Sequence, residues 1–192
     1  GQELMHSRAH ASELLLGELG VESLKTTQGA RVMVGGLGLG FTLVEVLAGL
    51  QPDAVVDVAE LLPEVVAWNR EFLRGLNGTA LDDARVQLHI EDAAKLIQRA
   101  KPGTYDALML DIDNGPVAMV ASGNQNLYSK SGLLGVKRAL KSVGRAIFWS
   151  ASMDVPFETR LKKAGFTVKA VPAKLHTNAK RAAYMLYVAE QE

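Results

Sequence analysis

Short apolar runs alternate with segments of helical periodicity along most of the chain. The apolar runs are rich in valine and other strand-forming residues and predict strands over residues 31–35, 54–59, 85–90, 105–111, 145–150, 166–171 and 182–189. Between them, apolar residues spaced three and four apart predict helices over residues 4–19, 41–50, 63–76, 92–100, 131–141 and 154–165. Short connections between strands and helices indicate βαβ units and a parallel sheet.

The order of these elements predicts a single α/β domain over residues 1–192. We expect a doubly wound, Rossmann-like, mostly parallel seven-stranded sheet, with residues 1–28 as a helical lead-in. The last two predicted strands have no helix between them, so we expect the final strand to be antiparallel. The chain opens on Gly1 rather than Met, which leaves open a missing upstream segment.

Two predicted helices carry an apolar stripe. Its members are Leu14, Leu15 and Leu19 in the first helix, and Val65, Trp68, Phe72 and Leu76 in the helix that begins with Pro63. Residues at this spacing share one face of a helix. We expect the first stripe to face the core and the second to form the apolar side of an amphipathic helix.

The charge balance and composition exclude several classes of protein. The 21 basic and 21 acidic residues cancel, which argues against nucleic-acid binding and a polybasic membrane-surface protein. No apolar run is long enough to span a membrane. The chain has no cysteine and only four histidines, so we expect neither disulfides nor a metal site. With 48% hydrophobic residues, the sequence predicts a folded cytoplasmic protein.

A glycine-rich turn joins the first strand to its helix and is the strongest motif. Gly36, Gly38 and Gly40 follow a G-x-G-x-G spacing, where glycine allows the backbone to approach a ligand closely. A dinucleotide fingerprint would need glycine or alanine where Phe41 stands, which disfavours NAD(P). The pattern favours a nucleoside ligand such as S-adenosylmethionine, with a plain tight turn as the alternative.

Acidic residues follow the next two predicted strands. Glu60 lies twenty residues after Gly40, where a carboxylate can accept both ribose hydroxyls of a nucleoside. Asp92 follows the third strand and can accept a hydrogen bond from an adenine amino group or cap its helix. We expect Glu60→Ala to weaken nucleoside binding and to leave the stability of the unliganded protein nearly unchanged.

The fourth strand runs into a further polar group, formed by Asp111, Asp113 and Asn114. Two carboxylates and an amide at the mouth of a parallel sheet are costly unless they meet a cation. A sulfonium or an amine substrate would supply that charge, and a capped turn is the alternative.

These segments, in their order and spacing over roughly residues 4–170, resemble the spermidine synthase (polyamine aminopropyltransferase) family. The loop GGLGLG stands where the family has GGGDGG, and Glu60-Leu61-Leu62-Pro63-Glu64-Val65 is similar to the family's E-I-D-P-E-V. Glu91-Asp92-Ala93 resembles the family's G-D-G/A. In the family's D-x-x-D-P, Asp111 matches the first aspartate and Asn114 replaces the second. Asn126-Leu127-Tyr128 resembles the segment before the family's next helix.

The resemblance implies the class I methyltransferase fold and S-adenosylmethionine or its decarboxylated form as co-substrate. It implies a donor site that includes Gly36, Gly38, Gly40, Glu60, Leu61, Asp92 and Ala93, and an acceptor site that includes Asp113, Asn114 and Tyr128. Asp111 is our candidate for the catalytic proton acceptor of an aminopropyl transfer to a small-molecule amine. We expect a homodimer. A methyltransferase and a non-catalytic nucleoside-binding dimer are the alternatives, and the missing carboxylate at Asn114 predicts poor use of putrescine.

Overall fold

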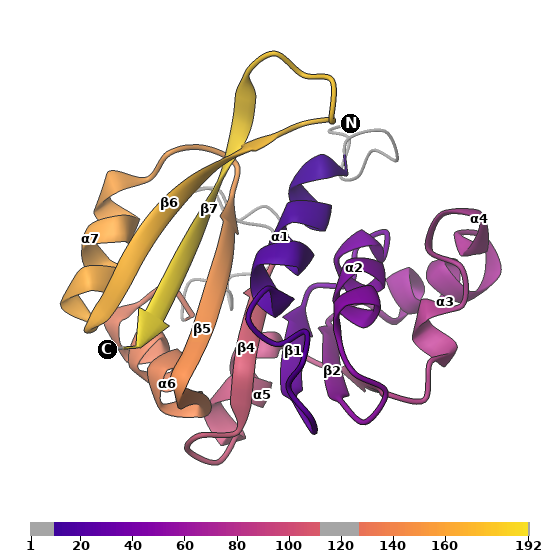
Figure 1. Cartoon of the computed structure of the whole chain (residues 1–192), viewed down its shortest axis with the longest axis horizontal. Coiled ribbons are helices and arrows are strands. Elements are labelled where there is room, and N and C mark those ends of the chain that lie inside the picture. Colours follow the sequence, from indigo (N-terminus) through magenta and orange to yellow (C-terminus); the bar gives the residue numbers. More distant parts are fainter. Residues whose placement is uncertain (1–9, 112–126, 192) are drawn as a thin grey trace.

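A computed structural model of the protein describes residues 10–111 and 127–191 (Figure 1). Seven strands form one sheet in the order β3-β2-β1-β4-β5-β7-β6. Their bounds are β1 Arg31–Gly35, β2 Val55–Glu60, β3 Val86–Ile90, β4 Tyr105–Leu110, β5 Leu140–Ser150, β6 Phe166–Lys174 and β7 Ala182–Gln191. Neighbouring strands from β3 to β5 are parallel, and β7 is antiparallel to both β5 and β6. The predicted fold class is therefore confirmed.

Helices cover both faces of this sheet. Their bounds are α1 Ala11–Val21, α2 Phe41–Gly49, α3 Pro63–Glu71, α4 Arg74–Asn77, α5 Ala93–Arg99, α6 Lys130–Ala139 and α7 Val155–Lys163, with a short 3-10 helix at Ala80–Asp82. One core lies on the side of α1 and α2 and includes valines of α3, and the other lies under α5, α6 and α7. Figure 1 shows α1 and α2 in front of the sheet, with α5 and α6 behind it.

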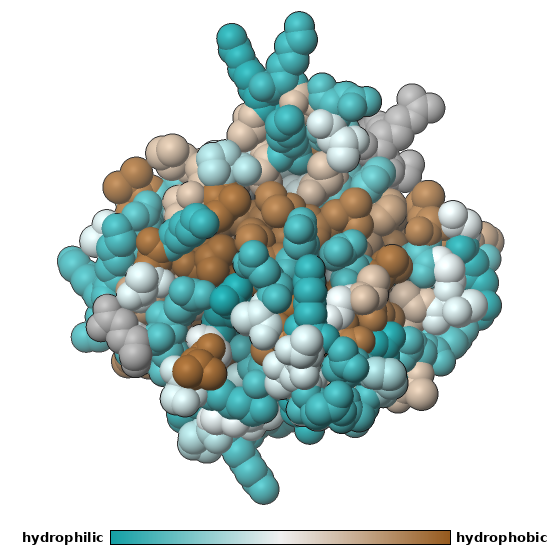
Figure 2. Space-filling model, in the orientation of Figure 1, coloured by the Kyte–Doolittle hydropathy of each residue, from teal (hydrophilic) through white to brown (hydrophobic). Residues whose placement is uncertain are grey.

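The fully buried leucine of the first helix is not a member of its predicted leucine stripe. Leu16 is completely buried, whereas Leu15 and Leu19 pack at the margin of the core and Leu14 is half-buried. The reason is the close crossing of α1 and α2, which turns a different side of α1 inward. Figure 2 shows a band of apolar surface over α1 and the neighbouring strands β6 and β7.

The predicted helix 63–76 is wrong in two respects. It is broken at Phe72 and Leu73 into α3 and α4. Its buried side consists of Val65, Val66 and Asn69, whereas the predicted stripe members Trp68, Phe72 and Leu76 are exposed. The side that faces inward is set by what α3 must contact, which is the chain between β1 and α2.

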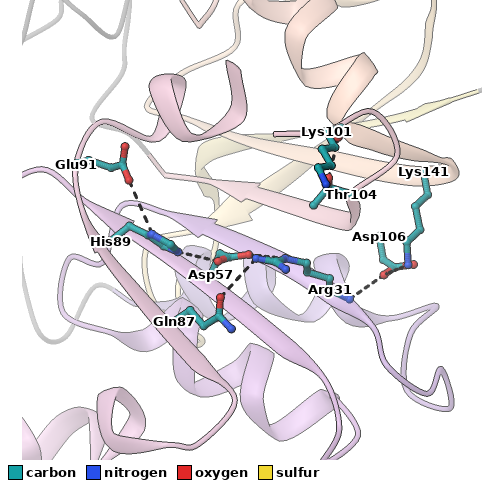
Figure 3. Close-up of polar contacts among 9 residues, drawn as sticks. All are labelled: Arg31, Asp57, Gln87, His89, Glu91, Lys101, Thr104, Asp106 and Lys141. Carbon is teal, nitrogen blue, oxygen red and sulfur yellow. Dashed lines mark hydrogen bonds and ion pairs between the residues drawn. The ribbon is translucent and has the colours of Figure 1, made fainter. Parts of the chain in front are cut away.

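A row of polar side chains crosses the β1, β2 and β3 side of the sheet (Figure 3). The fully buried Asp57 carboxylate accepts a hydrogen bond from Arg31 Nε at 2.8 Å and lies 2.7 Å from His89 Nε2. A buried charge is tolerable when it is paired in this way. The neighbouring Tyr105 ring is also buried, and burial together with the Asp57 charge raises the pKa of its hydroxyl to about 12.

None of the helices in residues 10–111 and 127–191 combines the length and the apolar character that a membrane crossing requires.

Candidate functional site

The glycine loop makes the tight turn that its sequence predicts. Gly36, Gly38 and Gly40 have φ angles of 89°, 50° and 85°, in the left-handed region that glycine adopts without steric cost. The Gly36 N–H donates to Ala59 O at 2.9 Å, which joins the loop to the end of β2. Gly40 is the N-cap of α2 and offers no side chain to the first-turn N–H groups of that helix. Such a helix start suits a ligand that carries negative charge or hydrogen-bond acceptors.

Two buried asparagines donate side-chain hydrogen bonds to backbone carbonyls of this loop. Asn69 Nδ2 donates to Gly38 O at 2.8 Å, and Asn77 Nδ2 donates to Leu39 O at 3.2 Å and also to Asn69 Oδ1. A Cβ atom on Gly40 would lie 2.9 Å from Asn77 Nδ2 and 3.0 Å from Asn69 Oδ1, so the pair leaves room for glycine only. The sequence patterns indicated neither asparagine. The available sign was Asn69, a poor helix former within the predicted helix 63–76, whereas Asn77 follows the end of that helix.

The Glu60 carboxylate supports the loop from the side of β2. Glu60 is 8% exposed; its Oε2 accepts the Leu37 N–H and its Oε1 accepts the Leu62 N–H, both at 2.9 Å. A carboxylate has about four acceptor positions, so lone pairs remain for the hydroxyls of a ribose. This geometry corrects the expectation that Glu60→Ala leaves the stability unchanged, because the change would leave the N–H groups of Leu37 and Leu62 without their acceptor.

The ends of β2 and β3 supply apolar surface beside Glu60. Leu61 is exposed, and so is Ile90, the residue that pairs with Glu60 in the register of β2 and β3. Asp92 is the N-cap of α5, where its Oδ1 accepts the Ala94 N–H at 2.7 Å. The neighbouring Ala93 is buried. The two exposed side chains can contact a flat base, and sequence analysis did not single out Ile90.

A second group of side chains lies near the end of β4. The Asp111 N–H donates to Gly35 O at 2.9 Å, which fixes this residue beside the glycine loop. Burial raises the pKa of the Tyr184 hydroxyl, and the charges of Glu13 and Asp111 raise it further. Burial also raises the pKa of the Glu13 carboxyl. The Tyr184 ring lies 4.8 Å from that of Trp149. Two carboxylates beside aromatic rings can attract a cation.

Glu13, Tyr184 and Trp149 come from α1, β7 and β5, so no local pattern relates them. Sequence analysis missed Glu13 and Tyr184 for this reason. Asp113 and Asn114 lie outside the described residues. Tyr128 packs its ring at 6.1 Å from Phe148 and 5.3 Å from Phe157, in the core on the side of α6 and α7.

A groove of about 320 Å³ lies elsewhere, between the ends of α1 and α2. Its lining includes Val21, Gly49 and Gln51. The glycine loop precedes α2, whereas Gly49 ends this helix and Gln51 follows it, so the groove lies at the opposite end of α2 from the candidate site.

A family model for the spermine/spermidine synthase domain matches residues 12–166, which include the glycine loop, Glu60 and Asp111. The chain belongs to this family. One family relative, a polyamine aminopropyltransferase of Prochlorococcus marinus (strain MIT 9515), is 34% identical over 82 residues, which make up 43% of this chain and 29% of that protein. The family assignment made from the motifs is thereby confirmed.

Solved structures show the same fold. A spermidine synthase in complex with the transition-state analogue AdoDATO has a TM-score of 0.68 at 17% identity and covers 95% of this chain, which spans 59% of that protein. Human methyltransferase-like protein 13 in complex with SAH has a TM-score of 0.67 at 20% identity, over 98% of this chain and 83% of that protein. The fold is thus common to an aminopropyltransferase and a methyltransferase-like protein.

Proposed function

We propose that this protein is a spermidine synthase-like transferase that uses S-adenosylmethionine or its decarboxylated form to transfer an aminopropyl group to an amine. The observation that carries this proposal is the contact between the glycine loop and Glu60. Three left-handed glycines and a buried carboxylate meet at the carboxyl ends of β1 and β2, in a chain of the spermine/spermidine synthase family. Ligands of doubly wound folds bind at this edge of the sheet.

The donor site would use backbone and side chains together. Glu60 would accept the ribose hydroxyls through its remaining lone pairs, and the exposed Leu61 and Ile90 would contact the base. Asp92 would accept from the adenine amino group while it caps α5. The loop and the start of α2 would then direct the sulfonium toward Asp111.

The reaction would be a displacement at the carbon next to the sulfonium. The amine lone pair forms the new C–N bond, and the C–S electrons return to sulfur, which leaves as a neutral thioether. The proton lost by the amine would pass to Asp111. Asp113, Asn114 and Tyr128 remain our proposed acceptor contacts. The protein would contribute positioning and one proton acceptor, because the leaving group needs no protonation.

One observation favours methyl transfer as a second candidate. The family's loop pattern GGGDGG places an aspartate where this chain has Gly38. An aspartate at that position would repel the carboxylate of S-adenosylmethionine, and a glycine does not. The start of α2 would instead attract that carboxylate.

We expect Asp111→Asn to keep donor affinity and to lower turnover by about 10²–10⁴-fold, the usual share of a general base. Donor binding would be measured by calorimetric titration with S-adenosylmethionine, its decarboxylated form and methylthioadenosine. Turnover would be measured with the decarboxylated donor and putrescine. Asp82→Asn is the matched control, because Asp82 forms an exposed ion pair with Arg74 and should leave both quantities unchanged.

The same assay separates the candidate reactions. We expect poor turnover of putrescine by the natural protein and a gain in Asn114→Asp, because a carboxylate attracts a second ammonium group more strongly than an amide does. Efficient spermidine formation by the natural protein would show that the second carboxylate is dispensable. Tight binding of S-adenosylmethionine without aminopropyl transfer in any variant would favour the methyltransferase or a binding protein.

A further inference from the structure

Basic side chains are concentrated in the last part of the chain. Residues 159–189 contain seven lysines and arginines and no aspartate or glutamate, although the whole chain has 21 basic and 21 acidic residues. Three of the seven lie at the turn of the β6–β7 hairpin: Lys174 ends β6, and Lys180 and Arg181 directly precede β7. All three are exposed, and none forms an ion pair with a described residue. We refer to these three residues as the hairpin cations.

The hairpin extends beyond the edge of the sheet at which the candidate site lies. Ser150, the last residue of β5, pairs with Met185, so the part of β7 before Met185 has no partner on β5. The hairpin cations belong to this projecting part, and Lys174 directly follows Ala173, the residue that pairs with Tyr184. Figure 1 shows the turn of the hairpin at the same end of the molecule as the start of α1, and hydrophilic side chains project there in Figure 2.

Protection of a free strand edge does not account for the hairpin cations. β6 is the edge strand, and lysine and proline on such a strand, here Lys169 and Pro172, commonly prevent pairing with another chain. Lys180 and Arg181 instead precede β7, which is paired on both sides. Neighbouring positive charges repel each other, and a bound anion would relieve that repulsion.

The candidate acceptor site beside the hairpin carries the opposite charge. Thr42 Oγ1 donates to Glu13 O at 3.2 Å, which places Glu13 beside the first turn of α2 and near the glycine loop. The charges of Glu13 and Asp111 both act on the Tyr184 hydroxyl. Burial raises the pKa of the Glu13 carboxyl, and a bound ammonium group would compensate its negative charge. This edge of the sheet therefore offers a place for a cation and, next to it, a place for an anion.

We propose that the amine acceptor is zwitterionic, an amino-acid-like molecule whose amine lies between Glu13 and Asp111 and whose carboxylate faces the hairpin cations. This inference rests on the proposed transferase function and names its acceptor class. A diamine such as putrescine carries two positive charges near neutral pH, and the hairpin cations would repel the second one. A carboxylate on the acceptor replaces this repulsion by attraction. Because the hairpin cations are exposed, salt would screen their effect.

The test compares two probes that differ by one carboxylate, because ornithine is putrescine with a carboxylate on the carbon that bears one amino group. Binding of each probe is measured by calorimetric titration with and without methylthioadenosine, so that selectivity is recorded whether or not the nucleoside binds. We expect the natural protein to bind ornithine at least about fivefold more tightly than putrescine, and this preference to shrink at high salt.

The double variant Lys180→Glu, Arg181→Glu should reverse this preference. We expect its affinity for ornithine to fall by about tenfold and its affinity for putrescine to rise, because two charges change sign. Lys101→Glu is the matched control, because Lys101 is exposed before β4, at the opposite edge of the sheet, and should leave both affinities unchanged. Glu13→Gln should weaken the binding of both probes. Circular dichroism and thermal unfolding would show that the variants fold.

Equal affinity of the natural protein for the two probes, or tighter binding of putrescine, would overturn the proposal, and so would an unchanged preference in the double variant. Weaker binding of S-adenosylmethionine by the double variant, with unchanged affinity for methylthioadenosine and ornithine, would assign the hairpin cations to the donor carboxylate and would also overturn it. A natural protein that prefers ornithine but does not bind methylthioadenosine would support the acceptor class and contradict the proposed donor site.

Discussion

At the end of β2, one carboxylate joins two turns of the backbone. Glu60 accepts hydrogen bonds from the N–H groups of Leu37 in the glycine loop and Leu62 before α3, and its carboxylate has further acceptor positions. The residue therefore has a structural role in the unliganded protein and a proposed role in binding. Replacing Glu60 should therefore lower both the stability of the unliganded protein and its affinity for a nucleoside.

We expect Glu60→Ala to lower the free energy of unfolding by about 1–3 kcal/mol and to weaken nucleoside binding, because two buried donors lose their acceptor. Urea denaturation measures the first effect and calorimetric titration the second. Glu18→Ala, an exposed change on α1, is the control and should stay within about 0.5 kcal/mol of the natural protein. Unaltered nucleoside affinity would contradict the ribose role, and unaltered stability would contradict the structural one.

At the level of elements, the crossing of α1 and α2 depends on a missing side chain. A Cβ atom on Gly17 would lie 2.8 Å from Glu45 Cβ and 3.0 Å from Thr42 O. The backbone of α2 cannot move away easily, because this helix begins at the glycine loop. The crossing thus positions α1, and with it Glu13, beside the candidate acceptor site.

Gly17→Ala should therefore destabilise the protein by roughly 1–3 kcal/mol, the usual cost of overpacking. Gly135→Ala is the matched change, because Gly135 lies within α6 with open space around its Cβ position. It should stabilise the protein by roughly 0.4–1 kcal/mol through the lower entropy of the unfolded chain. Thermal unfolding of both variants measures the difference, and similar melting temperatures would show that the crossing can relax.

For the whole molecule, the buried tyrosines determine the response to high pH. The folded protein raises the pKa of Tyr105 to about 12 from an ordinary value near 10, because its ring is buried and lies near Asp57. A raised pKa means that the contribution of this group to stability is present below pH 10 and is lost as the pH rises through about 12. Burial raises the pKa of Tyr184 and Tyr187 in the same direction.

We expect the free energy of unfolding to fall by about 2–3 kcal/mol between pH 10 and pH 12 through Tyr105 alone. Urea denaturation at a series of pH values measures this slope, and ultraviolet titration of the phenols should show delayed ionisation until the protein unfolds. In Tyr105→Phe the loss of unfolding free energy between pH 10 and pH 12 should be smaller by about 2–3 kcal/mol. An unchanged slope in that variant would show that other groups cause the alkaline loss.

The sequence by itself determined the strand order along the chain, the parallel sheet and the glycine loop. These features follow from local chemistry: apolar periodicity distinguishes strands from helices, and only glycine adopts the φ angles found at Gly36, Gly38 and Gly40 without strain. The positions of Glu60, Asp92 and Asp111 at strand ends were also predictable, because parallel strands bring their carboxyl ends to one edge. Strand lengths were less predictable, since pairing with β7 extends β6 to Lys174.

Only the tertiary structure decided which side of α3 faces inward. The predicted stripe of Val65, Trp68, Phe72 and Leu76 has the periodicity of one helix side, yet of these four the structure buries only Val65. The other buried residues of α3 are Val66 and Asn69, and Asn69 contacts the glycine loop. Periodicity reports which residues share a side of a helix, and the neighbouring elements determine where that side points.

The packing of distant elements also decides which residues form the acceptor side of the candidate site. Glu13, Asp111 and Tyr184 are separated widely along the chain, and the charges of Glu13 and Asp111 influence the Tyr184 hydroxyl because α1 packs against both β4 and β7. Likewise, the sequence places Glu60 at a strand end, but its bonds to Leu37 and Leu62 depend on how two turns approach it. Distances between residues far apart in sequence are set by packing, which no local pattern contains.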